Sequence, residues 1–191
     1  MPTITVPTIY FDKPGPKNTA QTLAVARERA IQLGIQTALV ASSSGRTGVQ
    51  AMEALQCCQV VVVTHSTGFS GPNVQELLPA HRAAIEEKGG RILTCQHAFG
   101  GVNRAVRKKL STYLNDEIIA YALRVFGEGT KVCIEIALMA ADAGLVTVGE
   151  PCVAIGGTGG GADTALVLIP TNAQTFFDLR VLEVLAKPRL G

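Results

Sequence analysis

Tryptophan is absent from this chain, and all aromatic residues together make up only 5% of it. Charged residues are also few, at 17%, and the net charge is only +2. Proteins that bind nucleic acids stack bases on interleaved aromatic side chains or present a strongly basic surface. We therefore expect no nucleic-acid partner.

The chain also lacks a long hydrophobic run. No uncharged apolar stretch approaches the roughly 20 residues that a membrane-spanning helix needs. Residues 1–8 contain neither the positively charged start nor the apolar segment of a secretory signal peptide. We therefore expect no membrane partner and a cytoplasmic protein.

Cysteine occurs only five times, with one adjacent pair and no repeated spacing. An odd number argues against a disulfide framework, and the irregular spacing argues against a zinc site. His65 and His97 have no carboxylate or cysteine nearby at ligand spacing, so they do not make a metal site either. We expect no metal and buried free thiols at the five positions, which are Cys57, Cys58, Cys95, Cys133 and Cys152.

Hydrophobic residues, by contrast, make up 47% of the 191 residues, which is enough to fill a large core. Apolar runs predict strands at residues 37–42, 59–64, 91–95, 152–155 and 164–169. Helical spacing predicts helices between them, and a further helix in the tail from 172 to 186. This alternation is typical of a mostly parallel sheet with helices on both faces. We expect one domain over residues 1–191, with a strand-free helical insertion at about 100–149.

The clearest chemical signal is the serine loop, residues 42–48, which joins the first expected strand to a helix. Backbone N–H groups at a helix N-terminus favour an anion, and hydroxyls and a guanidinium add donors. The loop lacks the lysine of a P-loop and the glycine spacing of a dinucleotide site. It therefore indicates a phosphate monoester, the alternative being a helix start that holds only water. The candidate ligand-binding residues are Ser42, Ser43, Ser44, Gly45, Arg46 and Thr47.

Three more loops follow expected strands at the same edge, where open α/β sheets bind ligands. They are residues 64–73, residues 95–101 and the glycine loop, residues 156–164. The glycine loop either approaches a ligand closely or only supplies backbone angles that other residues avoid. Asp163 either accepts hydrogen bonds from a ribityl or ribose hydroxyl or caps its own loop. The candidate binding residues here are Gly157, Thr158, Gly159, Gly160, Gly161 and Asp163.

His65 and His97 both follow strands at this edge and are candidate general acids or bases. The alternative is that each braces its loop through a hydrogen bond. Thr64, Gly68 and Phe69 are further candidates for ligand binding, because Phe69 would wall one side of a ring unless it fills the core.

A run of basic residues lies in the helical stretch after residue 100, at Arg104, Arg107, Lys108 and Lys109. It forms a solvated helix face, a second anion-binding patch or a contact between subunits. Because helices outside the sheet are rich in isoleucine, leucine and alanine, we expect a homo-oligomer.

The strand, the Ser-Gly-Arg-Thr turn and the helix after it resemble the carboxy-terminal domain of pyruvate kinase. In that domain a turn of this kind holds the phosphate of a sugar-phosphate effector. Nearly the whole chain is similar to stand-alone members of the pyruvate kinase alpha/beta domain family. The motifs that carry the resemblance are Tyr10-Phe11, Asn18-Thr19, Ser43-Ser44-Gly45, Val63-Thr64-His65, Gly68-Phe69, Lys131-Val132 with Glu135, residues 139–144, residues 156–164 and Lys187-Pro188-Arg189.

The resemblance implies a three-layer α/β/α fold with a five-stranded, mostly parallel sheet of order 3-2-1-4-5, the last strand antiparallel. It also implies flavin mononucleotide (FMN) as the ligand, with its phosphate on residues 42–47. It does not imply pyruvate kinase activity, because that chemistry belongs to a barrel domain for which this chain has no room.

Three functions follow from the resemblance and the residues together. The favoured one is binding of a small phosphate ligand, FMN, in a reaction that the sequence leaves unassigned. The second is a flavin-dependent oxidoreductase in which His65 or His97 delivers protons beside the ring. The third is a non-catalytic effector-sensing module that binds a sugar phosphate.

Overall fold

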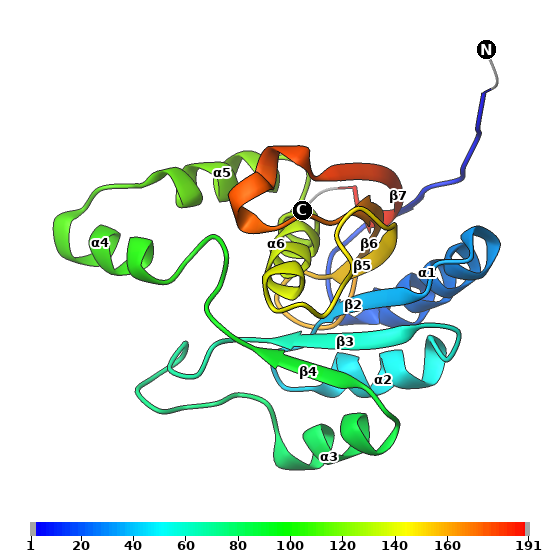
Figure 1. Ribbon diagram of the computed structural model, residues 1–191, viewed down its shortest axis with the longest axis horizontal. Coiled ribbons are helices and arrows are strands. Elements are labelled where there is room, and N and C mark those ends of the chain that lie inside the picture. The colour runs from blue at the N-terminus through cyan, green and yellow to red at the C-terminus, as the bar shows by residue number, and fades with distance from the viewer. Residues whose placement is uncertain (1–2, 190–191) are drawn as a thin grey trace.

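In a computed structural model, which describes residues 3–189, the apolar runs of the chain form one sheet of seven strands (Figure 1). Met1 and Pro2, part of the segment expected to lack a signal peptide, lie outside the described residues. The strands are β1 (Ile9–Phe11), β2 (Thr37–Ala41), β3 (Gln59–Thr64), β4 (Arg91–Thr94), β5 (Cys152–Gly156), β6 (Thr164–Ile169) and β7 (Arg180–Pro188). Their spatial order is β1-β7-β6-β5-β2-β3-β4.

The five strands expected from the sequence are β2 to β6, and they lie in the expected order with β6 antiparallel to β5. The expected total of five strands is wrong, because β7 pairs antiparallel with β6 and β1 pairs parallel with β7. The expected tail helix is also wrong in large part. The tail forms only a short 3-10 helix, η2 (Ala173–Asp178), before β7 begins.

The helices are α1 (Thr19–Leu33), α2 (Arg46–Ala54), α3 (Pro79–Glu87), α4 (Val102–Leu110), α5 (Asn115–Arg124) and α6 (Glu128–Asp142), with a 3-10 turn η1 (Pro16–Asn18) before α1. Gly34 ends α1 in the left-handed region at φ 65°. Asn18 directly precedes the helix. Its side chain does not cap α1, however, because it donates to the backbone oxygen of Lys13.

Alternate residues of the central strands pack into two separate cores. Val40, Val62 and Ile155 face α1, α2 and α3, whereas Leu39 and Val61 face α6. Helix α6 therefore covers one face of the sheet and the first three helices cover the other, which gives the expected three layers (Figure 1). Both faces of these strands are apolar because both are buried.

The stretch from 100 to 149 contains three helices and no strand among its described residues. Helices α4 and α5 project beyond the sheet, and a third small core joins α5, α6 and η2. No helix in residues 3–189 combines the length and apolar character needed to cross a bilayer.

The five thiols differ in environment, so the expectation of five buried thiols is only partly right. Cys133 and Cys152 are buried, Cys58 and Cys95 are half-buried, and Cys57 is exposed. Burial raises the pKa of Cys152 to about 12, which keeps that thiol protonated and unreactive at neutral pH.

Candidate functional site

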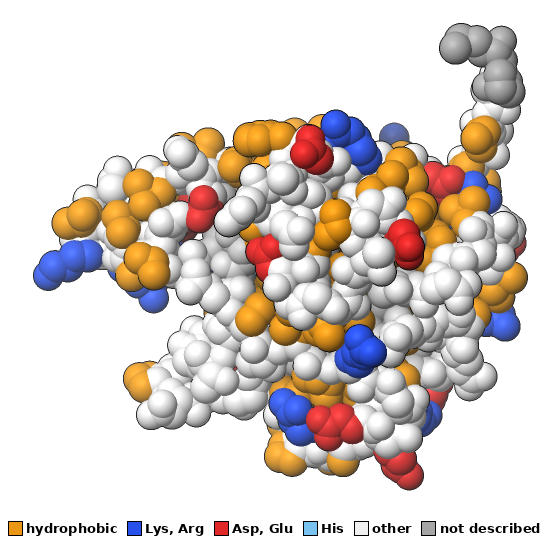
Figure 2. Space-filling model, in the orientation of Figure 1, with side chains coloured by type: hydrophobic (Ala, Val, Ile, Leu, Met, Phe, Trp, Pro, Cys, Tyr) orange, Lys and Arg blue, Asp and Glu red, His pale blue; other side chains and the backbone are white. Residues whose placement is uncertain are grey.

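The loops after β2, β3, β4 and β5 meet at one edge of the sheet and surround a cleft of about 990 Å³. Because β2 and β5 pair in parallel, the serine loop and the glycine loop both open into this cleft, as expected. Residues from α4, α5 and α6 line it as well. Figure 2 shows the surface hollowed between the projecting α4 region and the segment that follows β3.

The serine loop is held in place by the protein itself. Ser42 is buried, and its Oγ accepts a hydrogen bond of 3.1 Å from the amide of Gly48 in the first turn of α2. Gly45 has φ 91°, and a Cβ there would lie 2.6 Å from the Cβ of His81. The ring of His81 in turn donates to the backbone oxygen of Ser44 at 2.8 Å. His81 therefore secures the loop.

The hydrogen-bond donors of the serine loop that remain without a partner within residues 3–189 indicate a binding site for an anion. Ser44 and Arg46 are exposed, and both line the cleft together with Thr47. Arg46 forms no ion pair with any described residue. The first amides of a helix have no partner within the helix, and its dipole favours negative charge there. This edge of the cleft can therefore hold a phosphate or a carboxylate.

Ser43, His65 and Glu76 form a chain of hydrogen bonds on the same edge. The Oγ of Ser43 lies 3.1 Å from Nε2 of His65, and Nδ1 of His65 lies 2.8 Å from Oε2 of Glu76. A carboxylate only accepts hydrogen bonds, so Nδ1 carries the proton and Nε2 of the neutral ring accepts from the hydroxyl. His65 is therefore a base with an adjacent hydroxyl.

An aromatic shelf, formed by Phe69, His65 and His97, lines the cleft next to the hydrogen bonds between Ser43, His65 and Glu76. The ring of Phe69 lies 4.1 Å from that of His65 and stacks on His97 at 5.0 Å. Arg104 lies over the ring of Phe69 at 4.9 Å. Phe69 is 40% exposed, so it walls the cleft and does not fill the core.

Gly68 turns this segment at φ 89° and does not itself line the cleft. Thr64 does line it, but its hydroxyl is shared with Thr94 at 2.6 Å.

Helix α6 presents a buried ion pair to the cleft, between Lys131 and Glu135. Glu135 also accepts from the amide of Phe99 at 3.0 Å, and Nδ1 of His97 lies 3.8 Å away. Burial by itself would raise the pKa of Glu135, but interaction with His97 and the ammonium of Lys131 lowers it to about 2. Nε2 of His97 is buried without a hydrogen-bond partner among the described residues. His97 is thus a second imidazole at the cleft, held next to the buried ion pair of α6.

Asp163 holds the glycine loop together. Its fully buried carboxylate accepts from the amides of Gly15 and Thr158, at 2.9 and 3.1 Å, and from the hydroxyl of Thr164. These bonds match the loop-capping alternative, and neither Asp163 nor Thr158 lines the cleft. The loop residues that do line it are Gly157, Gly159, Gly160 and Gly161.

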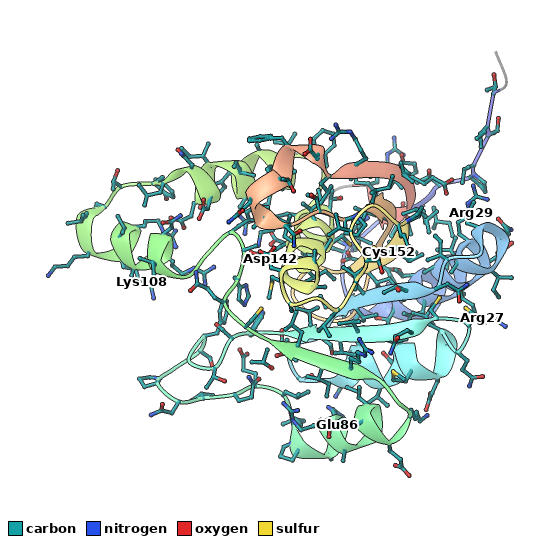
Figure 3. The ribbon with its side chains drawn as sticks, in the orientation of Figure 1. Arg27, Arg29, Glu86, Lys108, Asp142 and Cys152 are labelled. Carbon is teal, nitrogen blue, oxygen red and sulfur yellow. The ribbon has the colours of Figure 1, made fainter. Side chains whose placement is uncertain are left out.

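The basic run splits into separate environments. Arg104 lines the cleft, and Arg107 pairs with Glu117 at 3.0 Å. Lys108 lies on the part of α4 that projects from the molecule (Figure 3). Only the first residue of the run therefore contributes to the candidate site.

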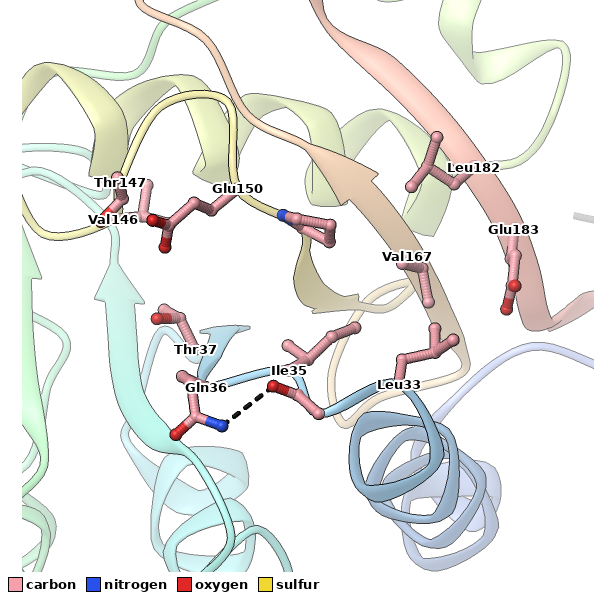
Figure 4. A pocket seen from close by; sticks show the side chains of 12 residues that line it. Leu33, Ile35, Gln36, Thr37, Val146, Thr147, Glu150, Val167, Leu182 and Glu183 are labelled. Atoms are coloured by element: carbon pink, nitrogen blue, oxygen red, sulfur yellow. Dashed lines mark hydrogen bonds between the residues drawn. The ribbon is translucent and has the colours of Figure 1, made fainter.

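A smaller pocket of about 350 Å³ lies at the amino ends of β2 and β5, between Ile35, Val146 and Val167 (Figure 4). Its wall is mostly apolar, and the amide of Gln36 is engaged with the backbone oxygen of Gly34 at 2.9 Å. It contains no hydroxyl–histidine pair or exposed arginine, so we place the functional site at the other edge.

Sequence reasoning did not select several residues of the cleft for their chemistry, namely Glu76, Arg124, Glu128, Lys131 and Glu135. The Lys131–Glu135 pair had a local signal, since these are the only charged residues between Glu128 and Asp142 of α6. Glu76 had none, because the conformation of the loop between β3 and α3 brings it to His65. Within residues 3–189, no group of three histidine, cysteine, aspartate or glutamate side chains is arranged to hold a metal ion.

A comparison with protein families agrees with this architecture. The family model described as pyruvate kinase, alpha/beta domain, matches residues 20–168, which is most of the chain. The matched segment runs from α1 through β6 and includes the serine loop, the aromatic shelf and the glycine loop. The chain therefore belongs to the pyruvate kinase alpha/beta domain family.

Proposed function

We propose that this chain binds a small phosphate ester, with FMN as the favoured ligand, and has no pyruvate kinase activity. The observation that carries the proposal is Arg46, an exposed guanidinium without an acidic partner among the described residues. It stands on the first turn of α2 beside the hydroxyl of Ser44. Charge, donor geometry and helix dipole all favour a doubly charged phosphate at this point.

The remainder of the cleft supports a ligand with a flat ring. Phe69, His65 and His97 offer ring faces, and the four glycines of the glycine loop that line the cleft leave its backbone open to close approach. When bound, FMN would supply redox chemistry. His65 and His97 would hold or donate protons beside it, which makes a flavin-dependent oxidoreductase the second candidate function.

The first test is identification of the ligand. The purified chain is denatured, and the released small molecules are identified by mass spectrometry. We expect FMN, seen also as a flavin absorption spectrum of the native protein. Release of a sugar phosphate without flavin would favour the effector-sensing alternative. Bleaching of the flavin by NAD(P)H, followed by reoxidation with an acceptor, would favour the oxidoreductase.

The second test addresses the serine loop. Arg46→Ala removes a charged contact worth about 1.5–3 kcal/mol, so affinity for FMN falls by roughly tenfold to more than a hundredfold. Arg27→Ala is the matched control, because Arg27 is exposed on α1 and does not line the cleft. Titration calorimetry measures both. Unchanged affinity in Arg46→Ala would contradict the placement of the phosphate.

We also propose that the chain forms a homo-oligomer through α4 and α5. Figure 2 shows hydrophobic side chains over this projecting region. The exposed members are Val102, Leu110, Tyr113, Ile118, Tyr121, Val125 and Phe126. Ile118→Lys should reduce the mass measured by light scattering, whereas Ile31→Lys on α1 should not. A monomeric parent chain would refute this interface. The cytoplasmic location stays a prediction of the sequence.

A further inference from the structure

Binding of a phosphate does not require the hydrogen-bonded series Ser43–His65–Glu76. A hydroxyl, an imidazole and a carboxylate stand in hydrogen-bonded order, at 3.1 Å and 2.8 Å. Ser43 follows β2, whereas His65 and Glu76 lie near the two ends of the loop that joins β3 to α3. A nucleophile beside a base that a third group orients is the arrangement by which serine enzymes activate a hydroxyl, and it is recognised by geometry and not by sequence order.

The surroundings of Ser43 also match this role. It follows a parallel strand and precedes a helix, at the edge of the sheet where hydrolases of α/β type place their nucleophile. The G-x-S-x-G spacing of those enzymes is absent. Ser43 is half-buried and lines the cleft, and the side chains of His65 and Glu76 are each 31% exposed. A substrate can therefore reach the hydroxyl.

We propose that Ser43 is a catalytic nucleophile for acyl transfer from esters that carry a negative charge. His65 is its general base and Glu76 is the positioning residue that holds the ring of His65. The charge preference follows from Arg46 and Arg104, which line the same cleft and form no ion pair with described residues. This inference goes beyond phosphate binding, although both use the serine loop.

The step balances with groups of this chain, an ester and water. Oγ of Ser43 attacks the ester carbonyl carbon while its proton moves to Nε2 of His65, and the carbonyl electron pair moves to oxygen. The amide of Thr47 on the first turn of α2 and the guanidinium of Arg46 offer donors for that oxygen, whereas the amide of Gly48 is engaged with Ser42. The C–O bond to the alcohol then breaks, and the alcohol takes the proton from His65. Water repeats the sequence on the acyl group, releasing a carboxylic acid and free Ser43.

A fluorophosphonate tests the nucleophile without knowledge of the substrate. Oγ of an activated serine displaces fluoride from phosphorus, and the adduct adds a fixed mass. The full chain is treated in phosphate-free buffer, and tandem mass spectrometry locates the adduct. We expect one adduct, on Ser43. His65→Ala should lower the labelling rate by about 10²- to 10⁴-fold, with partial recovery on addition of free imidazole.

Further variants separate positioning from folding. Glu76→Gln should slow labelling less than His65→Ala does, and Glu76→Asp should label faster than Glu76→Gln, because a carboxylate again accepts the hydrogen bond from Nδ1–H of His65. Ser70→Ala is the matched control, since Ser70 is an exposed serine near His65 in the chain and makes no hydrogen bond with described residues. It should be labelled like the parent. Circular dichroism confirms that each variant is folded.

Three outcomes would overturn the proposal. They are a folded parent chain without an adduct on Ser43, equal labelling of Ser43 and Ser70, and a folded His65→Ala variant that reacts at the parent rate. Failure here leaves phosphate binding intact, because titration of Arg46→Ala with FMN measures that separately. Conversely, loss of phosphate binding does not prevent labelling in phosphate-free buffer.

Discussion

The buried ion pair of α6 makes the stability of this protein depend on one carboxylate. Lys131 and Glu135 have side chains that are only 7% and 5% exposed, and both line the cleft. Replacement of Glu135 by glutamine keeps the size of the side chain and removes its charge. Lys131 then remains buried opposite a neutral amide, and the amide of Phe99 loses a charged acceptor.

The magnitude follows from the pKa of Glu135. It falls from an ordinary 4.5 to about 2 in the folded protein. A difference of one in pKa equals about 1.4 kcal/mol, so the ionised carboxylate stabilises the folded state by about 3 kcal/mol. Loss of one partner of a buried pair costs a similar amount, about 3–5 kcal/mol. For a chain of this size, 3 kcal/mol lowers the melting temperature by roughly 6–12 °C.

The change of stability with pH also has a defined direction. Because the folded pKa of Glu135 lies below the unfolded one, its contribution is fully present above pH 4.5 and disappears as pH falls toward 2. The free energy of unfolding, measured with urea, should decline in the parent chain as the pH is lowered from 7 to 3. This decline should be smaller in Glu135→Gln, which has already lost the contribution of the carboxylate at pH 7.

Two controls separate the buried charge from general effects. Glu53→Gln removes a carboxylate that is 63% exposed and pairs with Lys88, and it should change stability by less than about 1 kcal/mol. The double variant Lys131→Met with Glu135→Leu removes both charges and should recover most of the loss. A Glu135→Gln variant that unfolds like the parent at pH 7, with the same acid sensitivity, would refute this reasoning.

Other predictions concern the loops and the thiols. Gly45→Ala forces a positive φ on alanine and brings its Cβ within 2.6 Å of His81. It should cost about 1–3 kcal/mol in urea unfolding and weaken FMN binding, and unchanged values would contradict the strain. Asp163→Ala removes three hydrogen bonds to a buried carboxylate. Its free energy of unfolding should fall by at least about 2 kcal/mol, and a smaller loss would exclude the bracing role. Iodoacetamide should modify exposed Cys57 in the native protein but reach Cys152 only after unfolding; early modification of Cys152, seen by mass spectrometry, would show that its segment opens.

Local sequence was sufficient for most of the central sheet. Each of β2 to β6 is a short apolar run bounded by glycine, polar residues or a helix, and such runs identify strands wherever both faces are buried. The tail was different. Its apolar residues fit a helix as readily as a strand, because a short apolar run does not distinguish the helical period of 3.6 from the strand period of 2. They are Val181, Leu182, Val184 and Leu185. This segment forms a strand because it pairs with β6 and β1.

The sequence by itself determined where the serine loop lies, because residues 42–47 adjoin one another at the connection between an apolar strand and a helix. It did not determine what each residue there contacts. Only the folded structure placed His65 against Ser43 and Glu76 against His65, and only the fold brought His97 to Glu135, where it joins Lys131 in lowering the pKa of that carboxyl. The backbone fixes the relative positions of adjacent residues. Residues that are distant in the sequence come into contact only after the sheet has fixed the distance between its loops.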